Sequence, residues 1–252
     1  MLSLNADRLL AEQVVVAAGQ EILQFFDQPL EVYFKDSQVN APVTIADQRA
    51  EQLIVKLLQE ARPDDGLLGE EGACVSSQTG KQWLIDPLDG TLLFTRGLSG
   101  WTTTVALLEN KQAAVSAIYD PLSQDLWSAC TSAPSTLNGR PIQTTDCQNL
   151  KQAILHAAFP NLRSPDNDQV RKALTVIQTA GGALALGAPS ISLAALATGK
   201  IDAWINIKVK PWDWYPGASL VRAAGGSIAS VGDWKIAAAT EELLQEIIKL
   251  LV

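Results

Sequence analysis

Trp83-Leu-Ile-Asp-Pro-Leu-Asp-Gly-Thr91 is the stretch on which the interpretation of this chain depends, because it places two carboxylates directly after a short apolar segment. The apolar residues at its start predict a buried strand. Pro87 has no N–H to donate and is expected to end the hydrogen-bonded ladder. Asp86 and Asp89 would then lie at the carboxyl end of the strand, the edge where α/β sheets bind their ligands. The stretch therefore predicts a ligand site at a strand end.

The last two residues of the stretch favour a phosphate ligand. Gly90 has no Cβ, so the backbone can approach a bound group closely. If a helix begins at Thr91, its first N–H groups have no partner within the helix and lie at the positive end of the helix dipole. Carboxylates for metal ions and N–H groups for phosphate oxygens are thus expected at one corner of the sheet.

Composition bounds the class of protein. With 252 residues, 47% of them hydrophobic, the chain can bury a large core. Its formal charge of -8 and pI near 4.7 disfavour a nucleic-acid-binding surface. The three cysteines, Cys74, Cys130 and Cys147, are widely spaced and indicate neither a disulfide framework nor a thiolate zinc site. This spacing favours a reducing cytosol.

No membrane or export segment is expected from the sequence. Residues 1–11 carry charges and lack the apolar core of a signal peptide. The longest apolar stretch, Leu184–Ile205, is interrupted by proline and by charged residues. We therefore expect a soluble cytoplasmic protein that binds neither nucleic acid nor membrane.

Hydrophobic spacing predicts helices and then strands in the first half of the chain. Apolar residues recur at helical intervals over Asn5–Phe26 and over Thr44–Ala61, where Thr44 is the expected N-cap. Short apolar runs separated by turn residues then predict a sheet with at least one hairpin: Gly66–Gly69, Gln82–Asp86, Thr102–Leu108 and Ala113–Tyr119.

The second half alternates strands with helices, which indicates an α/β architecture in layers. The predicted strands are Ala153–Ala157, Ala183–Leu186, Ile201–Ile205 and Ser227–Ala229, and the predicted helices are Asn167–Ala180, Pro189–Thr198, Asp213–Ala224 and Thr240–Leu251. We expect one catalytic unit, residues 1–252. In it, an N-terminal α+β half of about 1–141 packs against a C-terminal α/β half of about 142–252, with the site at their interface.

Acidic residues stand beside small residues or at helix starts at four distant places: Asp47, Glu70-Glu71-Gly72, Asp86 with Asp89, and Asp213. Each has a structural alternative, since Asp47 could complete a capping box, the glutamates could form a solvated loop, and Asp213 could be a helix N-cap. Together they favour a metal site. Carboxylates that converge from strand ends would supply the oxygen ligands that Mg²⁺ needs, and two ions clamp the attacking and leaving oxygens in phosphate displacement.

Other catalytic schemes are less well supported. His156, the only histidine, lies in the apolar run Ala153–Phe159, where packing is the commoner role. Without it no Ser-His-Asp triad or histidine-rich zinc site can form. Leu88-Asp-Gly-Thr-Leu92 superficially matches the Asp-x-Asp-Gly-Thr signature of haloacid dehalogenase-type phosphatases, but Pro87 occupies the position of the nucleophile. Direct attack by a metal-bound water is therefore favoured over a covalent aspartyl phosphate.

The acidic motifs together resemble those of the inositol monophosphatase family. The matching segments follow the family's order over nearly the whole chain: Asp47, Gly69-Glu-Glu71, Ile85-Asp-Pro-Leu-Asp-Gly-Thr91, and Trp212-Asp213 followed by Ala224-Gly-Gly226. The resemblance implies a layered α/β/α/β/α sandwich of the inositol monophosphatase and fructose-1,6-bisphosphatase type, commonly a homodimer. It also implies Mg²⁺-dependent, lithium-sensitive hydrolysis of small phosphate monoesters.

Residue by residue, the resemblance implies two or three Mg²⁺ ions. Glu70, Asp86 and the carbonyl of Leu88 would hold the first ion. Asp86, Asp89 and Asp213 would hold the second, which would stabilise charge on the leaving oxygen. Glu70 would also support a third, weaker ion.

The resemblance also implies catalytic and phosphate-binding roles. The hydroxyl of Thr91, oriented by Asp47, would join Glu70 in positioning and activating the attacking water. The N–H groups of Gly90 and Thr91 would bind phosphate. Lys35 falls where the family has a basic residue on a mobile loop, although a surface lysine is an equally common interpretation.

The expected substrate contacts depart from the family's pattern. Ala188 lacks the hydroxyl and Pro189 lacks the N–H that the family's inositol enzymes direct at the polyol, and Asn206 stands where those enzymes commonly use a glutamate. If each lost contact costs roughly 1 kcal/mol, the three would weaken inositol phosphate binding about a hundredfold or more. The expected substrate-binding residues are Asp89, Gly187, Ala188 and Asn206.

Bulky residues follow Asp213 where the family generally has small ones. They are Trp214, Tyr215 and Pro216. We expect them to pack in the core rather than narrow the substrate pocket.

The sequence thus predicts a Mg²⁺-dependent phosphomonoesterase that hydrolyses a small phosphorylated metabolite, such as an inositol phosphate or a sugar phosphate, by metal-activated water. One alternative is a phosphatase for 3′-phosphoadenosine 5′-phosphate or a sugar bisphosphate. The other is a non-catalytic regulatory relative that has lost its polyol pocket. Retention of the whole acidic set argues against this last alternative, because decay would be expected to remove metal ligands as readily as substrate contacts.

Overall fold

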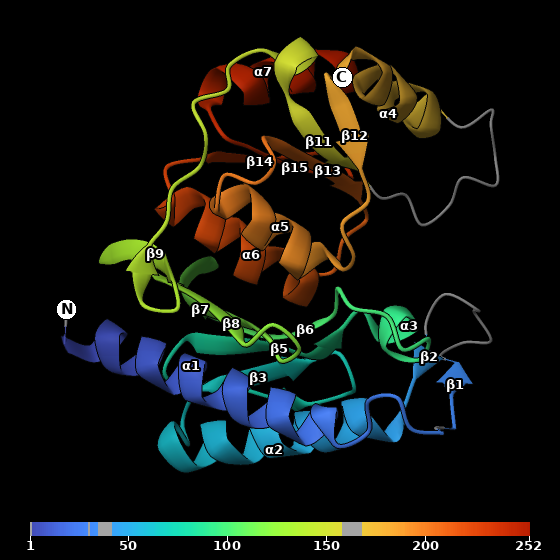
Figure 1. The fold of residues 1–252 in the computed structure, drawn as a ribbon. Helices are drawn as coiled ribbons and strands as arrows, with labels where there is room; N and C mark the ends of the chain where they lie inside the picture. Colours follow the sequence, from blue (N-terminus) through green and yellow to red (C-terminus); the bar gives the residue numbers. More distant parts are fainter. Residues whose placement is uncertain (1, 30, 35–41, 158–167) are drawn as a thin grey trace.

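Five layers make up the structure, a computed structural model that describes residues 2–29, 31–34, 42–157 and 168–252 (Figure 1). In order they are helices α1 and α2, a mixed sheet, helices α5 and α6, a second mixed sheet, and helices α4 and α7. This α/β/α/β/α sandwich confirms the predicted fold class. The helices are α1 (Leu2–Leu23), α2 (Ile45–Ala61), α3 (Thr91–Phe94), α4 (Asp168–Thr179), α5 (Pro189–Ala197), α6 (Pro211–Ala223) and α7 (Glu241–Leu251).

The first sheet has the strand order β10-β9-β8-β7-β6-β5-β3-β4. Its strands are β3 (Gly66–Gly69), β4 (Cys74–Val75), β5 (Lys81–Asp89), β6 (Thr102–Glu109), β7 (Gln112–Asp120), β8 (Asp125–Cys130), β9 (Ala133–Leu137) and β10 (Arg140–Pro141). β3 and β5 pair in parallel, and β5, β6 and β7 pair antiparallel. Asn110 and Lys111, between β6 and β7, have φ of 52° and 62°, as a two-residue type I′ turn requires, so the predicted hairpin is confirmed.

The second sheet has the order β12-β11-β13-β15-β14, in which β12, β11 and β13 are parallel and β15 and β14 antiparallel. Its strands are β11 (Ile154–Ala157), β12 (Gly182–Leu184), β13 (Ala203–Ile207), β14 (Ser227–Val231) and β15 (Trp234–Ala238). A small separate pair, β1 (Tyr33–Phe34) and β2 (Pro42–Val43), lies beside α3 (Figure 1).

Alternation along the strands decides which helices each side chain meets. On the first sheet Ile85 packs with α1 and α2, whereas Ile118 faces α5 and α6. On the second sheet Trp204 faces α5 and α6, and its neighbour Ile205 faces α4 and α7. Helices α5 and α6 therefore form a middle layer shared by both sheets.

The observed elements differ from the predictions in seven strands that were not predicted, in the bounds of α1, which spans Leu2–Leu23 rather than Asn5–Phe26, and in the start of α6. Four of these strands have only two residues: β1, β2, β4 and β10. The three longer strands that were missed are β8, β9 and β15, because β8 and β9 mix polar with apolar residues and β15 follows β14 after a short turn. Helix α6 begins at Pro211 rather than at Asp213, since proline suits the first helical position. The division into halves near residue 141 stays a prediction.

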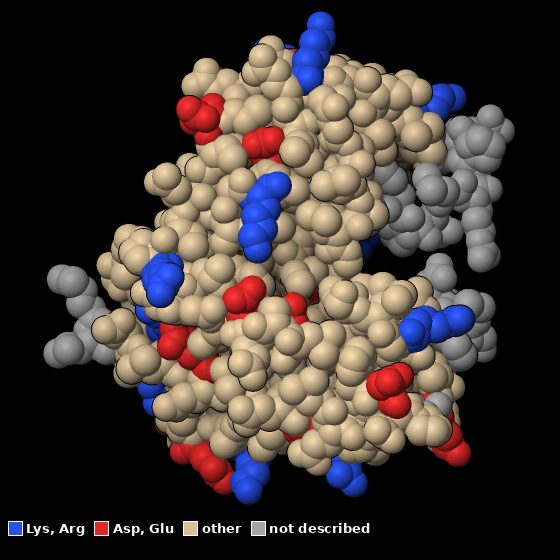
Figure 2. All heavy atoms as spheres, in the orientation of Figure 1, with Lys and Arg blue, Asp and Glu red and all other residues tan. Residues whose placement is uncertain are grey.

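Charged side chains are mixed over the face drawn in Figure 2. Lys and Arg stand singly there, with Asp and Glu between them. Among the described helices, none combines the length and the apolar character needed to cross a membrane.

Candidate active site

A β-bulge turns Asp86 and Asp89 toward the same side of the first sheet. Asp86 lies opposite Thr104 and Asp89 opposite Thr102, so three residue steps on β5 match two on β6. Residues two apart on β6 share a face, and their partners on β5 therefore do too. The prediction that Pro87 ends the ladder is wrong, because β5 continues to Asp89. Pro87 lies within the bulge, where the ladder is interrupted and a missing N–H is tolerated.

Asp213 meets these two aspartates from the first turn of α6. Oxygens of the three carboxylates lie within 4.8 Å of one another, and Asp86 and Asp89 are only 1% and 5% exposed. The helix N-cap is Lys210, whose N–H lies 3.4 Å from a carboxylate oxygen of Asp213. Asp213 is therefore not the N-cap, and its carboxylate lies in the acidic cluster formed by Asp86, Asp89 and Asp213.

Burial and mutual repulsion raise the pKa of all three carboxyls. Desolvation is the largest cause for each, and the charge of Glu70 adds to it. For Asp89, hydrogen bonds from Ser190 oppose the effect, and the pKa rises to about 6. Several carboxylate oxygens at one buried point repel each other unless a cation lies between them. The donor set therefore fits a hard divalent ion such as Mg²⁺, which prefers oxygen ligands.

Glu70 acts on the acidic cluster from the loop after β3, and a buried residue of α2 holds that loop. The carboxylate of Glu51 accepts the N–H of Glu71 at 2.9 Å and that of Ala73 at 2.8 Å. Gly69 leaves room for it, since a Cβ there would lie 2.3 Å from Glu51 Oε2. Sequence reasoning missed Glu51, because it occupies an ordinary helical position whose partners are 20 and 22 residues away.

Asp47 both caps a helix and reaches the site. Its Oδ2 accepts the N–H of Thr44 at 2.7 Å and the Thr44 hydroxyl at 2.6 Å, so the capping box is confirmed. Its Oδ1 lies 2.9 Å from the hydroxyl of Thr91, which is also 3.0 Å from the carbonyl oxygen of Leu88. The hydroxyl has one proton, so it donates to one of these oxygens at a time and keeps lone pairs for another donor.

Gly90 and Ala188 are neighbours, although almost a hundred residues of sequence separate them. Gly90 is the N-cap of α3 with a φ of 101°, and a Cβ there would lie 3.1 Å from the Cβ of Ala188. Glycine is required at this position for both reasons. The N–H of Ala188 donates to the carbonyl of Gly100 at 2.9 Å, and Gly187 packs against the same residue. The N–H of Ala188 is thus used within the fold.

Ser190, a residue that sequence reasoning missed, is bonded to Asp89. Its N–H donates to Asp89 Oδ2 at 2.8 Å, and its hydroxyl donates to the same oxygen. The hydroxyl of Thr102 lies 2.6 Å from the Ser190 hydroxyl. A serine at a helix start is too common to stand out, and its partner lies 101 residues away in the sequence.

Asn206 lies on β13 and is buried, at 7% exposed. Its side-chain oxygen accepts the N–H of Ile207 at 2.7 Å, and across the ladder it faces Lys235. The structure therefore places a neutral amide beside a lysine at the position expected to contact substrate. Lys35 lies outside the described residues.

The packing interpretation is confirmed for His156 and for bulky residues after Asp213. Nδ1 of His156 accepts the N–H of Leu186 at 3.1 Å, and the ring stacks on Trp204 with an interplanar angle of 8°. Burial lowers the pKa of His156 to about 4, so the ring is neutral at pH 7. Trp214 packs 5.6 Å from Trp204, between ring centroids, and Pro216 is buried.

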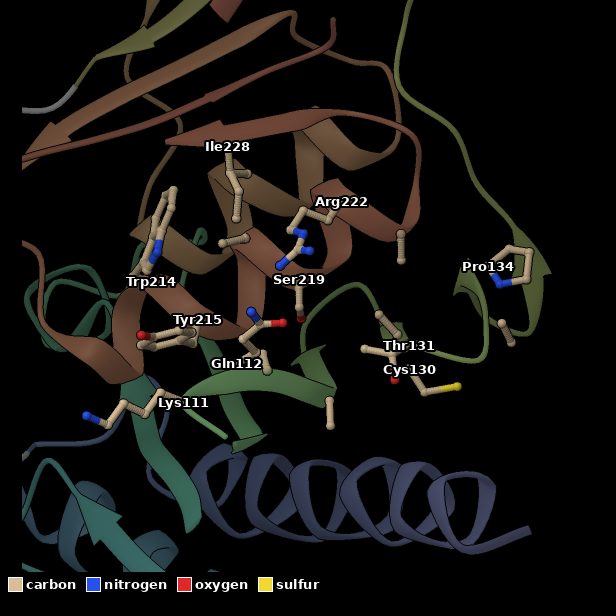
Figure 3. A pocket seen from close by; sticks show the side chains of 16 residues that line it. Lys111, Gln112, Cys130, Thr131, Pro134, Trp214, Tyr215, Ser219, Arg222 and Ile228 are labelled. Atoms are coloured by element: carbon tan, nitrogen blue, oxygen red, sulfur yellow. The ribbon is translucent and has the colours of Figure 1, made fainter. Parts of the chain in front are cut away.

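A cavity of about 510 Å³ lies on the other side of α6, facing the β6–β7 hairpin (Figure 3). Trp214 and Tyr215 line one end, and Ser219 and Arg222 extend from the same helix. The three aspartates of the acidic cluster are not in its lining. This cavity is therefore separate from the candidate active site.

Charge repulsion predicts an unusual stability effect when no cation is bound. In chelator at pH 7, Asp86→Asn should be more stable than the parent chain by on the order of 1 kcal/mol, a Tm increase of about 2–4 °C. Asparagine removes a buried like charge but keeps the oxygen that accepts the Leu88 N–H at 3.1 Å. Differential scanning calorimetry measures both proteins, and added Mg²⁺ should reverse their order. A parent chain that is the more stable in chelator would contradict this expectation.

The pH dependence of stability follows from the same repulsion. The pKa of Asp89 is about 6 in the fold against an ordinary 3.8. A carboxyl with a raised folded pKa contributes stability below its unfolded pKa and loses it as pH rises through the folded value. The Tm of the parent chain in chelator should therefore fall between about pH 4 and pH 7.

The fold and the site together define a class: layered α/β proteins with a buried carboxylate cluster beside a glycine-capped helix start. The chain belongs to the inositol monophosphatase family, whose model matches residues 5–247.

Comparison with known proteins agrees with this assignment. A protein named Nus factor SuhB from Xylella fastidiosa is 36% identical over 183 residues, 72% of this chain and 66% of that protein. An inositol-1-monophosphatase from Synechocystis is 31% identical over 228 residues, 88% of this chain and 77% of that protein. The solved structure of suhB from Bartonella henselae has a TM-score of 0.90 at 24% identity, with 98% of each chain covered, and supports the fold. The chain spans slightly less than two thirds of the Xylella relative's length.

Proposed function

We propose that this protein is a Mg²⁺-dependent phosphomonoesterase that acts on a small phosphorylated metabolite. The observation that carries the proposal is the convergence of Asp86, Asp89 and Asp213 within 4.8 Å, in a member of the inositol monophosphatase family. Buried acids in contact destabilise a fold unless they hold a cation. Their retention together therefore favours a bound divalent ion.

The proposed ligands follow the sequence prediction. Glu70, Asp86 and the Leu88 carbonyl would hold one ion, and Asp86, Asp89 and Asp213 a second, with a third, weaker ion on Glu70. Divalent ions bound there would supply an activated water and stabilise negative charge on the departing oxygen.

The proposed catalytic residues orient that water and the phosphate. Thr91 donates its proton to Asp47, 2.9 Å away, or to the Leu88 carbonyl, so its free lone pairs would accept a proton of the attacking water. Glu70 would accept a proton of the same water. The N–H groups of Gly90 and Thr91, at the start of α3, would bind the phosphate oxygens.

Among small phosphorylated metabolites, inositol phosphate is expected to bind more weakly than the preferred substrate. Gly187, Ala188 and Asn206 would border the leaving group together with Asp89, but the Ala188 N–H is already bonded to Gly100 and position 206 has no negative charge. Of these four residues, Ala188 and Asp89 already use one polar group each within the fold, which leaves fewer of their groups for a ring of hydroxyls.

A second candidate is a phosphatase for a substrate with two phosphates, such as 3′-phosphoadenosine 5′-phosphate or a sugar bisphosphate. Lys235 favours it, because antiparallel partners share a face and Lys235 is the direct partner of Asn206. Its ammonium lies 5.8 Å from the ring centre of Trp214 and could pair with a second phosphate.

Phosphate release from a panel tests the proposal. The panel contains sugar phosphates, inositol phosphates, histidinol phosphate, a sugar bisphosphate and 3′-phosphoadenosine 5′-phosphate, each with and without Mg²⁺. Mg²⁺-dependent release from at least one compound supports the proposal, and the ratio of kcat/KM values between bisphosphates and monophosphates decides between the two candidates. If none of the compounds releases phosphate, the proposal is overturned and a non-catalytic regulatory role is favoured. The name of the Xylella relative, Nus factor SuhB, is the reason for considering that alternative.

A further inference from the structure

We infer that Ser190, supported by Thr102, is a positioning residue that fixes the orientation of Asp89 and thereby the affinity of the second cation position. The inference rests on the proposed metal-dependent function. It concerns residues of this chain that touch a proposed metal ligand without being ligands themselves.

Both hydrogen-bonding groups of Ser190 meet one oxygen of Asp89. The N–H of Ser190 donates to Oδ2 at 2.8 Å, and the hydroxyl donates to the same atom. Ser190 is fully buried and Asp89 is 5% exposed, so water does not compete for these bonds. Oδ2 is therefore occupied, and Oδ1 is left for the acidic cluster.

The direction of the hydroxyl chain follows from the charge at its end. The Oγ atoms of Thr102 and Ser190 are 2.6 Å apart, and each hydroxyl has one proton. Asp89 as a carboxylate can only accept, so the Ser190 proton points at Asp89 and the Thr102 proton points at Ser190. Thr102, on the strand beside Asp89, thus fixes the rotation of the Ser190 hydroxyl.

Asp89 also supplies the cap that α5 lacks. The helix N-cap, Ala188, has no side chain that can accept a hydrogen bond, and Pro189 at the first helical position has no N–H. The amide of Ser190 is the next one in the helix, and it donates to Asp89 from the first sheet. The negative charge of Asp89 is favoured at this helix end. Asp89 and Ser190 therefore join the first sheet to the middle helix layer at the site.

This link aligns Asp89 with Asp213. Helices α5 and α6 touch closely, since a Cβ on Gly217 of α6 would lie 2.4 Å from the Cβ of Leu193 on α5. α5 holds Asp89 through Ser190, and α6 carries Asp213. Two ligands proposed for the second ion are thus set by one pair of packed helices, whereas Glu70 is set separately by α2.

The test measures Mn²⁺ binding, with Mn²⁺ replacing Mg²⁺ as a hard ion and the electron paramagnetic resonance signal of free Mn²⁺ as the readout. Ser190→Ala should lower the affinity of one Mn²⁺ ion about tenfold, because the hydrogen bond that is lost goes to a charged acceptor. The affinity of a second, more tightly bound Mn²⁺ ion should stay unchanged. Ser190→Thr, which keeps the hydroxyl, should restore binding. Thr102→Val should lower the affinity of the same ion about threefold. The effect is smaller because Thr102 acts on Asp89 only through the Ser190 hydroxyl.

Ser219→Ala is the matched control. Its hydroxyl bonds that of Ser116 at 2.6 Å, also between a middle-layer helix and the first sheet, but it lies away from the aspartates. Its Mn²⁺ affinity should equal that of the parent chain, while its Tm falls as in Ser190→Ala. Equal Mn²⁺ binding by the parent and Ser190→Ala would overturn the inference and leave the proposed function standing. If Ser190→Ala does not fold, parent-like binding by Thr102→Val overturns it instead. A parent chain that binds no Mn²⁺ would reject the proposed function itself.

Discussion

Asp86→Asn should lower Mg²⁺-supported phosphate release by about 10³-fold or more, the largest effect expected of any single substitution in this chain. Asp86 is the proposed ligand of both main ions, and it is 1% exposed, so water cannot replace its charge. Asparagine keeps the shape of the side chain, removes that charge and replaces one acceptor oxygen with an NH₂ group. The measurement is kcat/KM for the best substrate of the panel at saturating Mg²⁺.

Asp65→Asn is the control for this substitution. Asp65 is another buried acid close to β5, where it accepts Nε1–H of Trp83 at 3.1 Å and the Thr79 hydroxyl at 2.6 Å. Its substitution should reduce stability and leave the Mg²⁺ requirement unchanged. Activity of Asp86→Asn within tenfold of the parent would contradict the proposed role.

Thr91→Val should reduce kcat about 10²-fold or more and change Mg²⁺ affinity little, because the hydroxyl is proposed to orient the water rather than to hold an ion. Asp47→Asn should have a similar effect, since an amide in place of the carboxylate can turn its NH₂ group toward Thr91. The double variant should lose little more than either single one, because the two residues act as a unit. Single-turnover rates at saturating Mg²⁺ measure these effects.

Loss of helix capping must be separated from loss of catalysis in Asp47→Asn. Thr44→Ala removes the N-cap of α2, at a cost of about 1 kcal/mol, and leaves the bond between Asp47 and Thr91 in place. It should lower Tm while kcat stays near that of the parent. If Thr44→Ala and Asp47→Asn lose the same activity, Asp47 acts through the fold alone.

The sequence was informative where function and local structure depend on neighbouring residues. The apolar run before Asp86 predicts the strand, and Thr44 with Asp47 predicts the capping box. Asp47 both completes the capping box, through Oδ2, and bonds the hydroxyl of Thr91, through Oδ1. Helical and strand periodicity likewise predicted the layered α/β arrangement of the second half, whereas the five-layer sandwich was implied by the family resemblance.

Sequence reasoning failed where the answer depends on distant partners. Pro87 was expected to end a ladder, but the bulge that accommodates it is defined by the register with β6. Glu51 and Ser190 look ordinary in the sequence, and their importance appears only when α2 and α5 are placed beside the acidic residues. A buried polar side chain needs a hydrogen-bond partner, and that partner can lie far away in the sequence. Hydrophobic periodicity gives no information about such a contact.

The residues expected to recognise the substrate differ more from the family's pattern than those expected to bind metal and phosphate. The residues proposed to bind metal and phosphate lie at strand ends and helix starts of the first sheet and on α6. The leaving group would instead meet the segment after β12 and the end of β13, where Ala188 and Asn206 replace polar or charged groups. Lys235, the partner of Asn206, adds a positive charge there. A substrate with a second phosphate fits this change better than a polyol does.

Calorimetric titration of Mg²⁺ into the chelator-treated chain tests the central claim most directly, because it asks whether the buried acids are a cation site. We predict saturable Mg²⁺ binding to the parent chain and at least tenfold weaker binding to Asp89→Asn, which lacks one charge of the acidic cluster. No detectable binding to the parent chain, or binding by Asp89→Asn equal to that of the parent, would contradict it.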